Sequence, residues 1–221
     1  MKISESFTSL QGEGRYAGYQ MLFIRTSGCS RACDFCDSKY HQNGTEMTEK
    51  EVAKLIKRRC KFIRTPYIIR NHKTICFTGG EPLIFVDEIL DVISRFNYWF
   101  DYRYDFHLET NGDLLSDQVL RDIEGEIIYI SISPKMKDVA VKCKHLCERL
   151  DSEMYDIKVV TDLDKVGVDM LKYATILMPL TTYNEVKDKQ IRKKVWQYCV
   201  DNGLRYSPRL HYEVFGQKRG V

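Results

Sequence analysis

Apolar runs rich in β-formers alternate with stretches of helical periodicity, and this alternation constrains the fold more than any other feature. Strands are predicted at 21–26, 74–80, 105–112, 126–133, 154–160, 173–180 and 204–211. Helices are predicted at 47–60, 83–96, 117–123 and 185–203. Strands that alternate with helices form right-handed βαβ units around a parallel sheet. We therefore expect an α/β fold, an incomplete parallel βα barrel with about six core strands and a reduced helix set.

Two of the predicted helices carry recognisable end signals. Thr48 and Glu51 have the spacing of a capping box at the start of the first helix. Asn202 and Gly203 form a stop signal at the end of the last one.

The bulk composition limits the class of protein. The 221 residues, 43% hydrophobic and 29% charged, suit a globular protein with one substantial core, so we expect one domain over residues 1–221. The net charge of +3 favours no partner, and the basic run 57–59 is interpreted as a solvated helix face. No apolar run reaches the ~18 residues of a membrane span, and residues 1–14 lack an apolar signal segment. We expect a cytoplasmic protein without membrane or direct nucleic-acid contacts.

Polar or glycine-rich segments follow five of the predicted strands. These segments are residues 28–33, 78–82, 109–112, 133–135 and 209–211. The carboxyl ends of parallel strands lie at one rim and carry the functional site in such folds. The five segments should therefore line one pocket.

Cys29, Cys33 and Cys36 form a tight cluster directly after the first predicted strand. Thiolates bind soft metals, including zinc and iron–sulfur clusters. Structural zinc takes four protein ligands, and a cubane cluster usually takes four thiolates. Three thiolates leave one iron with an open position, which a catalytic metal needs. A zinc site that borrows His41 or another cysteine is the alternative interpretation.

The spacing Cys-x3-Cys-x2-Cys, followed after the next strand by "TGGEP" (78–82), resembles the radical S-adenosylmethionine superfamily. The resemblance implies that the open iron binds S-adenosylmethionine. The reduced cluster then cleaves it to a 5′-deoxyadenosyl radical, with electrons from a flavodoxin- or ferredoxin-type donor. Gly79 and Gly80 would let the backbone approach the methionine end. Glu81 would either accept from its ammonium group or support the turn.

Further motifs narrow the resemblance. "SLQGEGRYAGYQMLFIRTSGC", "CDFCDS", "ETNG", "SISPK" and "RYSPRLHYEVFGQKRGV" together resemble the 7-carboxy-7-deazaguanine synthase family of queuosine and deazapurine biosynthesis. The family reaction is that of a carbon–nitrogen lyase. It contracts the ring of 6-carboxy-5,6,7,8-tetrahydropterin to 7-carboxy-7-deazaguanine with loss of ammonia. The resemblance also implies a [4Fe-4S] cluster, catalytic S-adenosylmethionine, Mg²⁺ and a homodimer.

The resemblance implies a set of substrate-binding residues. These are Leu10, Gln11, Gly12, Glu13, Arg25, Thr78 and His211. Arg25 would clamp the substrate carboxylate through a two-pronged ion pair. The amide of Gln11 and the carboxylate of Glu13 complement a guanine-like edge.

The resemblance also implies cofactor and metal contacts. Those to S-adenosylmethionine are Phe35, Cys36, Asp37, Gly80, Glu109, Ser133, Pro134 and Lys135. Glu109 would hold ribose hydroxyls, and Lys135 would pair with the cofactor carboxylate. Ser38 stands where the family usually has threonine, and its hydroxyl would ligate Mg²⁺, an ion that prefers hard oxygens and several waters.

Several alternatives stay open at this point. A small radical enzyme that activates a partner protein, or a non-enzymatic iron–sulfur or zinc module, would share the cysteine loop. Cys143 and Cys147 lie one helical turn apart, either as a second metal site or as buried small hydrophobes. The product's fate, in transfer RNA, DNA or a small molecule, is not encoded in these motifs.

Overall fold

A nine-stranded sheet forms the centre of the computed structural model, which describes residues 1–33, 36, 43–60, 73–100, 104–218 and 220. The spatial order is β3-β1-β2-β4-β5-β6-β7-β8-β9. The strands are β1 (Lys2–Leu10), β2 (Gln20–Thr26), β3 (Thr45–Glu46), β4 (Lys73–Gly79), β5 (Tyr104–Thr110), β6 (Tyr129–Ile132), β7 (Tyr155–Thr161), β8 (Ile176–Pro179) and β9 (Arg205–Tyr206).

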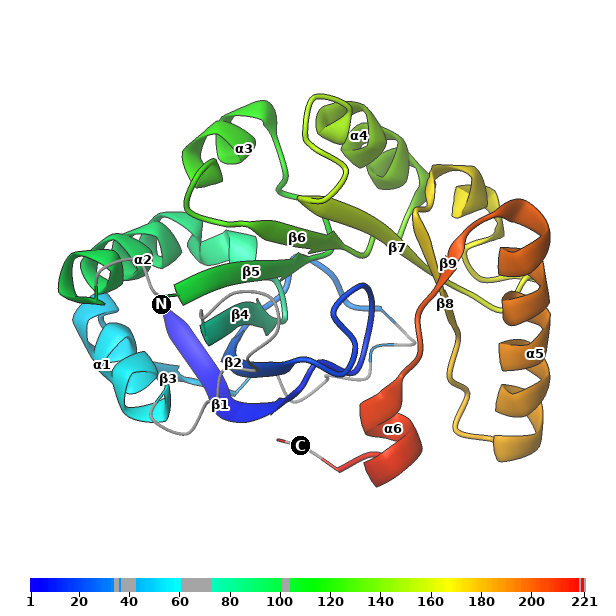
Figure 1. The fold of residues 1–221 in the computed structure, drawn as a ribbon, viewed down its shortest axis with the longest axis horizontal. Helices are drawn as coiled ribbons and strands as arrows, with labels where there is room; N and C mark the ends of the chain where they lie inside the picture. Colours follow the sequence, from blue (N-terminus) through cyan, green and yellow to red (C-terminus); the bar gives the residue numbers. More distant parts are fainter. Residues whose placement is uncertain (34–35, 37–42, 61–72, 101–103, 219, 221) are drawn as a thin grey trace.

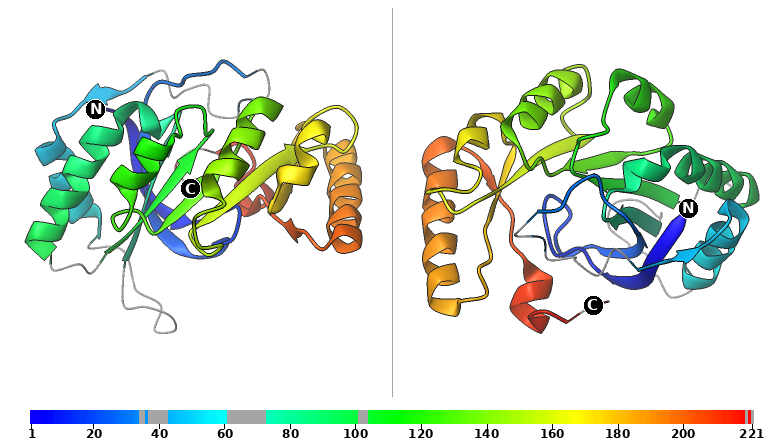
Figure 2. Two further views of the ribbon diagram at one scale, coloured as in Figure 1. Left: turned by 90° about the horizontal axis from the view of Figure 1, so that it is seen from above. Right: turned by 180° about the vertical axis from the view of Figure 1, so that it is seen from behind.

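Helices cover the outer face of this sheet. They are α1 (Glu49–Cys60), α2 (Val86–Phe100), α3 (Asp117–Ile123), α4 (Lys137–Cys147) and α5 (Glu185–Asn202), with short 3-10 helices η2 (Pro82–Phe85) and η3 (Val168–Tyr173). The last helix, α6 (Leu210–Phe215), lies instead by the cavity at the inner face, which His211 and Tyr212 line. Figure 1 shows α1 to α5 around the convex side, and the views in Figure 2 agree. None of the helices in the described ranges is long and apolar enough to cross a bilayer.

The sheet is a partial barrel, as predicted. The strands from β2 through β9 pair in parallel, in chain order apart from β3, and β1 is antiparallel to β2. Within the described ranges β3 and β9 each have one neighbour, so the barrel is open. The loop between β1 and β2 enters the concave side (Figure 1), where the Tyr16 ring lies 4.6 Å from His107 and 4.8 Å from Tyr129.

The two faces of the sheet differ because successive side chains of a strand point to opposite sides. On β2, Leu22 and Ile24 are buried in the core between sheet and helices. Phe23 and Arg25 point to the concave side and line a cavity there. Thr78 and Lys158 do the same from β4 and β7. The outer face therefore holds the hydrophobic core, and the inner face is available for polar chemistry.

Local end signals account for several element boundaries. Thr48 and Glu51 form the predicted capping box, with Glu51 N–H donating to Thr48 Oγ1 at 3.3 Å and Thr48 N–H to Glu51 Oε2 at 2.8 Å. Ser116 Oγ accepts from Val119 N–H at 3.2 Å and begins α3 at the predicted position. Gly203, with a left-handed φ of 64°, ends α5 as the stop signal predicted.

The prediction of a final strand over 204–211 was wrong in extent. Only Arg205–Tyr206 is a strand, and α6 begins at Leu210. The first strand, Lys2–Leu10, was not predicted, because three serines, Thr8 and Glu5 interrupt its apolar pattern. Its pairing with β2 holds it in place.

Cys143 and Cys147 lie on the buried face of α4 and belong to the core. Burial raises the pKa of the Cys143 thiol to about 11 and that of Cys147 to about 12. The two residues are therefore small core hydrophobes, the second of the two interpretations drawn from the sequence.

Candidate active site

A cavity of about 460 Å³ opens at the carboxyl ends of the parallel strands, where the polar segments were predicted to meet. The residues predicted for the site that line it are Leu10, Gln11, Gly12, Glu13, Arg25, Cys29, Cys33, Cys36, Thr78, Gly80, Glu109, Ser133, Lys135 and His211. Segments that span almost the whole chain therefore share one cavity.

Four predicted site residues are not placed in this cavity. Pro134 is not among its lining residues, although its neighbours on both sides are. Phe35, Asp37 and Ser38 lie outside the described residues, as does His41 of the alternative zinc site.

The three cysteines of the loop after β2 lie on the cavity wall, half-buried and without disulfide bonds. Burial raises the pKa of the Cys33 thiol, and the nearby thiols of Cys36 and Cys29 raise it further, against the charge of Lys135. Among the described residues no three His, Cys, Asp or Glu side chains converge enough to hold one ion. The donor set nevertheless fits an iron–sulfur cluster, because three adjacent free thiols face the same space.

The cysteine loop is anchored to the segment that follows β5. Arg31 makes a two-pronged ion pair with Asp113, with Nε–Oδ2 at 2.6 Å and Nη2–Oδ1 at 2.7 Å. Ser30 Oγ donates to the same carboxylate at 2.9 Å. Asn111 Nδ2 donates to Ser30 Oγ at 3.0 Å and lies 3.8 Å from Cys29 Sγ. Asp113 and Asn111 were not predicted, although both lie in or next to the "ETNG" motif.

Glu81 supports the turn after β4, one of the two roles considered for it. It is fully buried. Its Oε1 accepts from Thr110 Oγ1 at 2.6 Å and from Leu83 N–H at 3.0 Å, and its Oε2 accepts from Asn111 N–H at 2.7 Å. Burial raises the pKa of Glu81, against these hydrogen bonds. Both oxygens of the Glu81 carboxylate thus accept hydrogen bonds from other residues of the protein.

Glu109 joins residues from three segments inside the cavity. Its Oε1 accepts from Gln11 Nε2 at 3.0 Å and its Oε2 accepts from Thr78 Oγ1 at 2.7 Å. Both partners were predicted as substrate contacts, whereas Glu109 was predicted to hold ribose. Nearby, Lys135 Nζ donates to Ser133 Oγ at 2.8 Å.

Glu13 is the centre of a cluster of charges at the cavity wall. Its Oε2 pairs with Lys158 Nζ at 2.5 Å and its Oε1 with Arg209 Nε at 3.2 Å, while His211 Nε2 lies 3.9 Å from Oε1. Burial alone would raise the pKa of Glu13, but the charges of Lys158 and Arg209 outweigh it and hold that pKa well below its usual range. Glu13 is therefore ionised at neutral pH.

Sequence reasoning missed Lys158, and it expected Arg209 at the pocket only as part of the segment 209–211, without a role of its own. Lys158 is 5% exposed in the middle of the apolar strand β7. Because lysine is almost never fully buried unless it is paired, its place in "YDIKVV" was a signal. The pKa of Lys158 is raised, since the charges of Glu13 and Glu109 outweigh the opposing effect of burial.

Arg25 lines the cavity with a side chain that is 15% exposed, and its Nε donates to Glu5 Oε1 at 2.8 Å. Glu5 is its cross-strand partner on β1. At the opposite end of the chain, His211 packs onto the backbone of Gly12. A Cβ at Gly12 would lie 2.1 Å from His211 Nδ1, so only glycine permits this approach.

The comparisons with known proteins agree with this arrangement. The family model "Radical SAM superfamily" matches residues 23–190. The 7-carboxy-7-deazaguanine synthase of Thermoplasma acidophilum is 30% identical over 231 residues, covering 100% of both chains. The enzyme of the same name from Pyrobaculum aerophilum is 25% identical and covers 100% of this chain and 97% of that one.

Solved structures show the same fold. QueE from Escherichia coli superposes with a TM-score of 0.56 at 18% identity, covering 95% of this chain and 94% of that one. Native anSMEcpe with bound AdoMet and a peptide gives a TM-score of 0.59 at 18% identity, covering 83% and 60%. From the family model and the full-length relatives together, this chain belongs to the 7-carboxy-7-deazaguanine synthase family of the radical SAM superfamily.

Proposed function

We propose that this protein converts 6-carboxy-5,6,7,8-tetrahydropterin to 7-carboxy-7-deazaguanine with loss of ammonia, as a radical SAM carbon–nitrogen lyase. Family membership over the whole chain supports this reaction. The observation that carries the proposal is that one cavity is lined both by the three thiols and by the ionised Glu13 with its cations.

Cys29, Cys33 and Cys36 would hold the [4Fe-4S] cluster, since they are free and face one space. When bound, the cluster and S-adenosylmethionine supply the 5′-deoxyadenosyl radical. Gly80, Ser133 and Lys135 line the same cavity and are proposed to contact the cofactor. Glu109 is also proposed to contact the cofactor, and its carboxylate accepts hydrogen bonds from Gln11 and Thr78, which are proposed for the substrate.

Glu13 is proposed to recognise the pyrimidine edge of the pterin. Each carboxylate oxygen has two lone pairs, so Glu13 can accept from the substrate while it keeps its bonds to Lys158 and Arg209. An ionised carboxylate only accepts, which selects a substrate edge made of N–H donors. Arg25 is proposed for the substrate carboxylate, with Thr78 and His211 at the same cavity.

Ser38 is proposed as a Mg²⁺ ligand through its hydroxyl, with substrate oxygens and water completing the shell. Ser38→Ala should lose most of the magnesium stimulation and much of the activity, yet assemble its cluster normally. Activity titrated with MgCl₂ tests this, with iron content as the control. Unchanged stimulation in the variant would remove Ser38 from the metal site.

The remaining features of the proposal come from the length and composition of the sequence and from the family resemblance. We propose a single cytoplasmic domain over residues 1–221, a homodimer, and a flavodoxin- or ferredoxin-type electron donor. The product would enter 7-deazapurine synthesis, with transfer RNA modification of the queuosine type as one destination.

The test is an anaerobic assay. The protein is reconstituted with iron and sulfide, reduced, and supplied with S-adenosylmethionine, Mg²⁺ and 6-carboxytetrahydropterin. Mass spectrometry should detect 7-carboxy-7-deazaguanine. Formation of 5′-deoxyadenosine without this product would keep the radical chemistry and overturn the substrate assignment, in favour of an enzyme that acts on another substrate. Failure to form either from an intact cluster would contradict both.

A further inference from the structure

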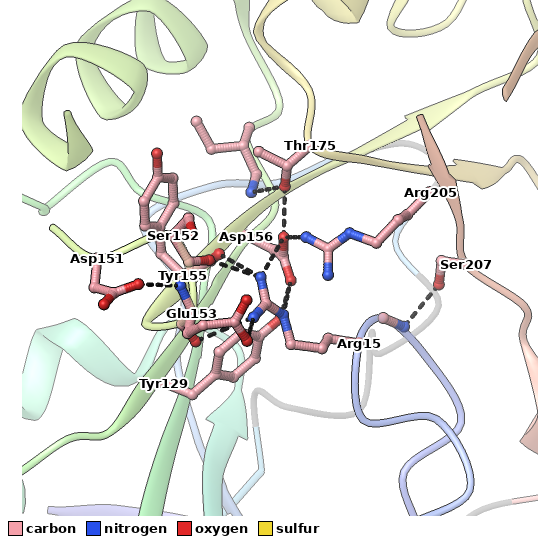
Figure 3. A network of polar contacts seen from close by, with 12 residues as sticks. Arg15, Tyr129, Asp151, Ser152, Glu153, Tyr155, Asp156, Thr175, Arg205 and Ser207 are labelled. Carbon is pink, nitrogen blue, oxygen red and sulfur yellow. Dashed lines mark hydrogen bonds and ion pairs between the residues drawn. The ribbon is translucent and has the colours of Figure 1, made fainter. Parts of the chain in front are cut away.

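The carboxylate of Asp156 lies buried near the start of β7, outside the cavity, and is shared by side chains from four other segments (Figure 3). Its Oδ2 accepts from Arg15 Nε at 2.9 Å and from the Tyr129 hydroxyl at 2.8 Å. Its Oδ1 accepts from Thr175 Oγ1 at 2.7 Å and pairs with Arg205 Nη2. Two cations and two hydroxyls therefore compensate one buried anion, as such a charge requires.

Arg15 belongs to the loop between β1 and β2, and its guanidinium is saturated by β7 and the turn before it. Besides Asp156, it reaches Glu153 Oε2 at 2.5 Å, Ser152 O at 2.7 Å and Tyr155 O at 3.5 Å. Figure 3 shows the Arg15 guanidinium surrounded by these hydrogen-bond acceptors. The loop that carries Gln11 and Glu13 is thus fixed at its middle, residue 15 of 11–19.

Arg205 belongs to the C-terminal segment, which carries Arg209 and His211 into the cavity. This segment also lies directly against the loop. Ser207 Oγ accepts from Gly14 N–H at 2.8 Å (Figure 3). Leu210 N–H donates to Gly12 O at 3.0 Å. Asp156 therefore pairs with both segments at the same time, with Arg15 of the loop and with Arg205 of the C-terminal segment.

The pairing also sets the register of the loop on β7. Asp156 and Lys158 are two positions apart and point to the same side of the strand. Glu13 and Arg15 are also two positions apart, and they meet Lys158 and Asp156 respectively. A shift of the loop by two residues would bring Glu13 to Asp156, two carboxylates at one buried site. The crossed pairs thus exclude that register.

We propose that Asp156 is a positioning residue for substrate binding. Through Arg15 and Arg205 it holds the loop and the C-terminal segment together, so that Gln11, Glu13, Arg209 and His211 share one geometry. The inference rests on the proposed function for the identity of the substrate. It predicts that loss of the Asp156 charge affects the substrate half of the cavity and spares the cysteine loop, which is anchored separately by Asp113.

The experiment compares Asp156→Asn with wild type and with Tyr129→Phe. The asparagine is isosteric and removes the charge, whereas the phenylalanine removes one hydrogen bond and leaves both arginine pairs. Hydrogen–deuterium exchange of the ligand-free, cluster-loaded protein reports order in residues 11–18 and 205–211. Kinetics report KM for 6-carboxytetrahydropterin and for S-adenosylmethionine separately.

In Asp156→Asn, exchange should speed up in both segments, and KM for the carboxypterin should rise about tenfold or more, the scale of a misplaced substrate contact. KM for S-adenosylmethionine and the electron paramagnetic resonance of the cluster should stay unchanged. Tyr129→Phe should resemble wild type in all four readouts. If Asp156→Asn fails to fold, Arg205→Gln decides the matter, because the Arg205 side chain is 46% exposed. It should loosen 205–211 and raise the same KM.

Unchanged exchange in either segment would overturn the proposal. So would equal rises of both KM values with faster exchange throughout the chain, which would mean a general structural role. If wild type made no deazaguanine, the proposed function would fall by itself. The exchange comparison would still decide whether Asp156 orders both segments.

Discussion

Lys158→Met tests the buried ion pair at the centre of the candidate site. Methionine matches the apolar stem of lysine as far as Cε and lacks the ammonium group. The Lys158 side chain is 6% exposed and that of Glu13 is 17% exposed. The variant therefore leaves a largely buried carboxylate whose remaining close partners are Arg209, with Nε 3.2 Å from Oε1, and His211, with Nε2 3.9 Å from Oε1.

The expected loss of stability follows from this geometry. Removing one partner of a buried ion pair costs about 3–5 kcal/mol, because the other charge stays buried without compensation. Arg209 still neutralises part of the Glu13 charge, so the lower end, about 3 kcal/mol, applies. For a chain of this size that corresponds to a fall in Tm of roughly 6–12 °C.

Urea unfolding at pH 7 measures the effect in wild type, Lys158→Met, Glu13→Gln and the double variant. Since both charges are absent in the double variant, it should regain much of the stability that Lys158→Met loses. The interaction energy from the cycle should exceed about 1 kcal/mol. An interaction energy below about 0.5 kcal/mol would refute the claim that Lys158 holds the Glu13 carboxylate in place.

The pH dependence supplies a second check on the same pair. The pKa of Glu13 is lowered in the folded state, so its pairing adds stability above the ordinary carboxylate pKa of about 4.3. That stability is lost as the pH falls from there toward the lowered folded pKa. The stability difference between wild type and Lys158→Met should therefore shrink as the pH falls below about 4.3. A difference that stays constant would contradict the assignment.

Three further predictions concern other parts of the site. Gly12→Ala should raise KM for the carboxypterin several-fold, because the new Cβ would lie 2.1 Å from His211 Nδ1 and would displace that side chain. Since His211 is already displaced, adding His211→Ala should change the steady-state kinetics little further. Burial lowers the pKa of His107 in the folded protein to about 3. As the pH falls below about 6.5, this imidazole therefore takes up a proton in the unfolded chain before it does so in the folded one. In urea titrations, the free energy of unfolding of wild type should therefore fall by about 2 kcal/mol between pH 8 and 5, whereas that of His107→Phe should not show this fall. His145→Gln, a change at an exposed histidine, is the control and should behave as wild type. Asp113→Asn should release the cysteine loop from Arg31, so the reconstituted cluster should lose iron faster in air, and equal rates of loss would contradict this anchoring role.

Local sequence patterns predicted most of the fold. The helix expected at 117–123 is α3, with Ser116 as its cap, and the strand expected at 154–160 is β7 within one residue. Hydrophobic periodicity and capping depend on residues only a few positions apart, so they can be recognised without the tertiary structure. The polar segments after the strands predicted one shared cavity for a similar reason, since parallel strands bring their carboxyl ends to one rim.

The sequence by itself determined the cysteine loop, the parallel strands and the polar segments that meet at the cavity. Only the tertiary structure decided which charges meet: Glu13 with Lys158 across 145 residues, Arg209 with Glu13 across 196, and Arg15 with Asp156 across 141. A charged residue in a buried strand shows that it needs a partner. Which partner it finds depends on how a loop and the C-terminal segment pack against the inner face of the sheet, because no local pattern couples residues so far apart in the chain.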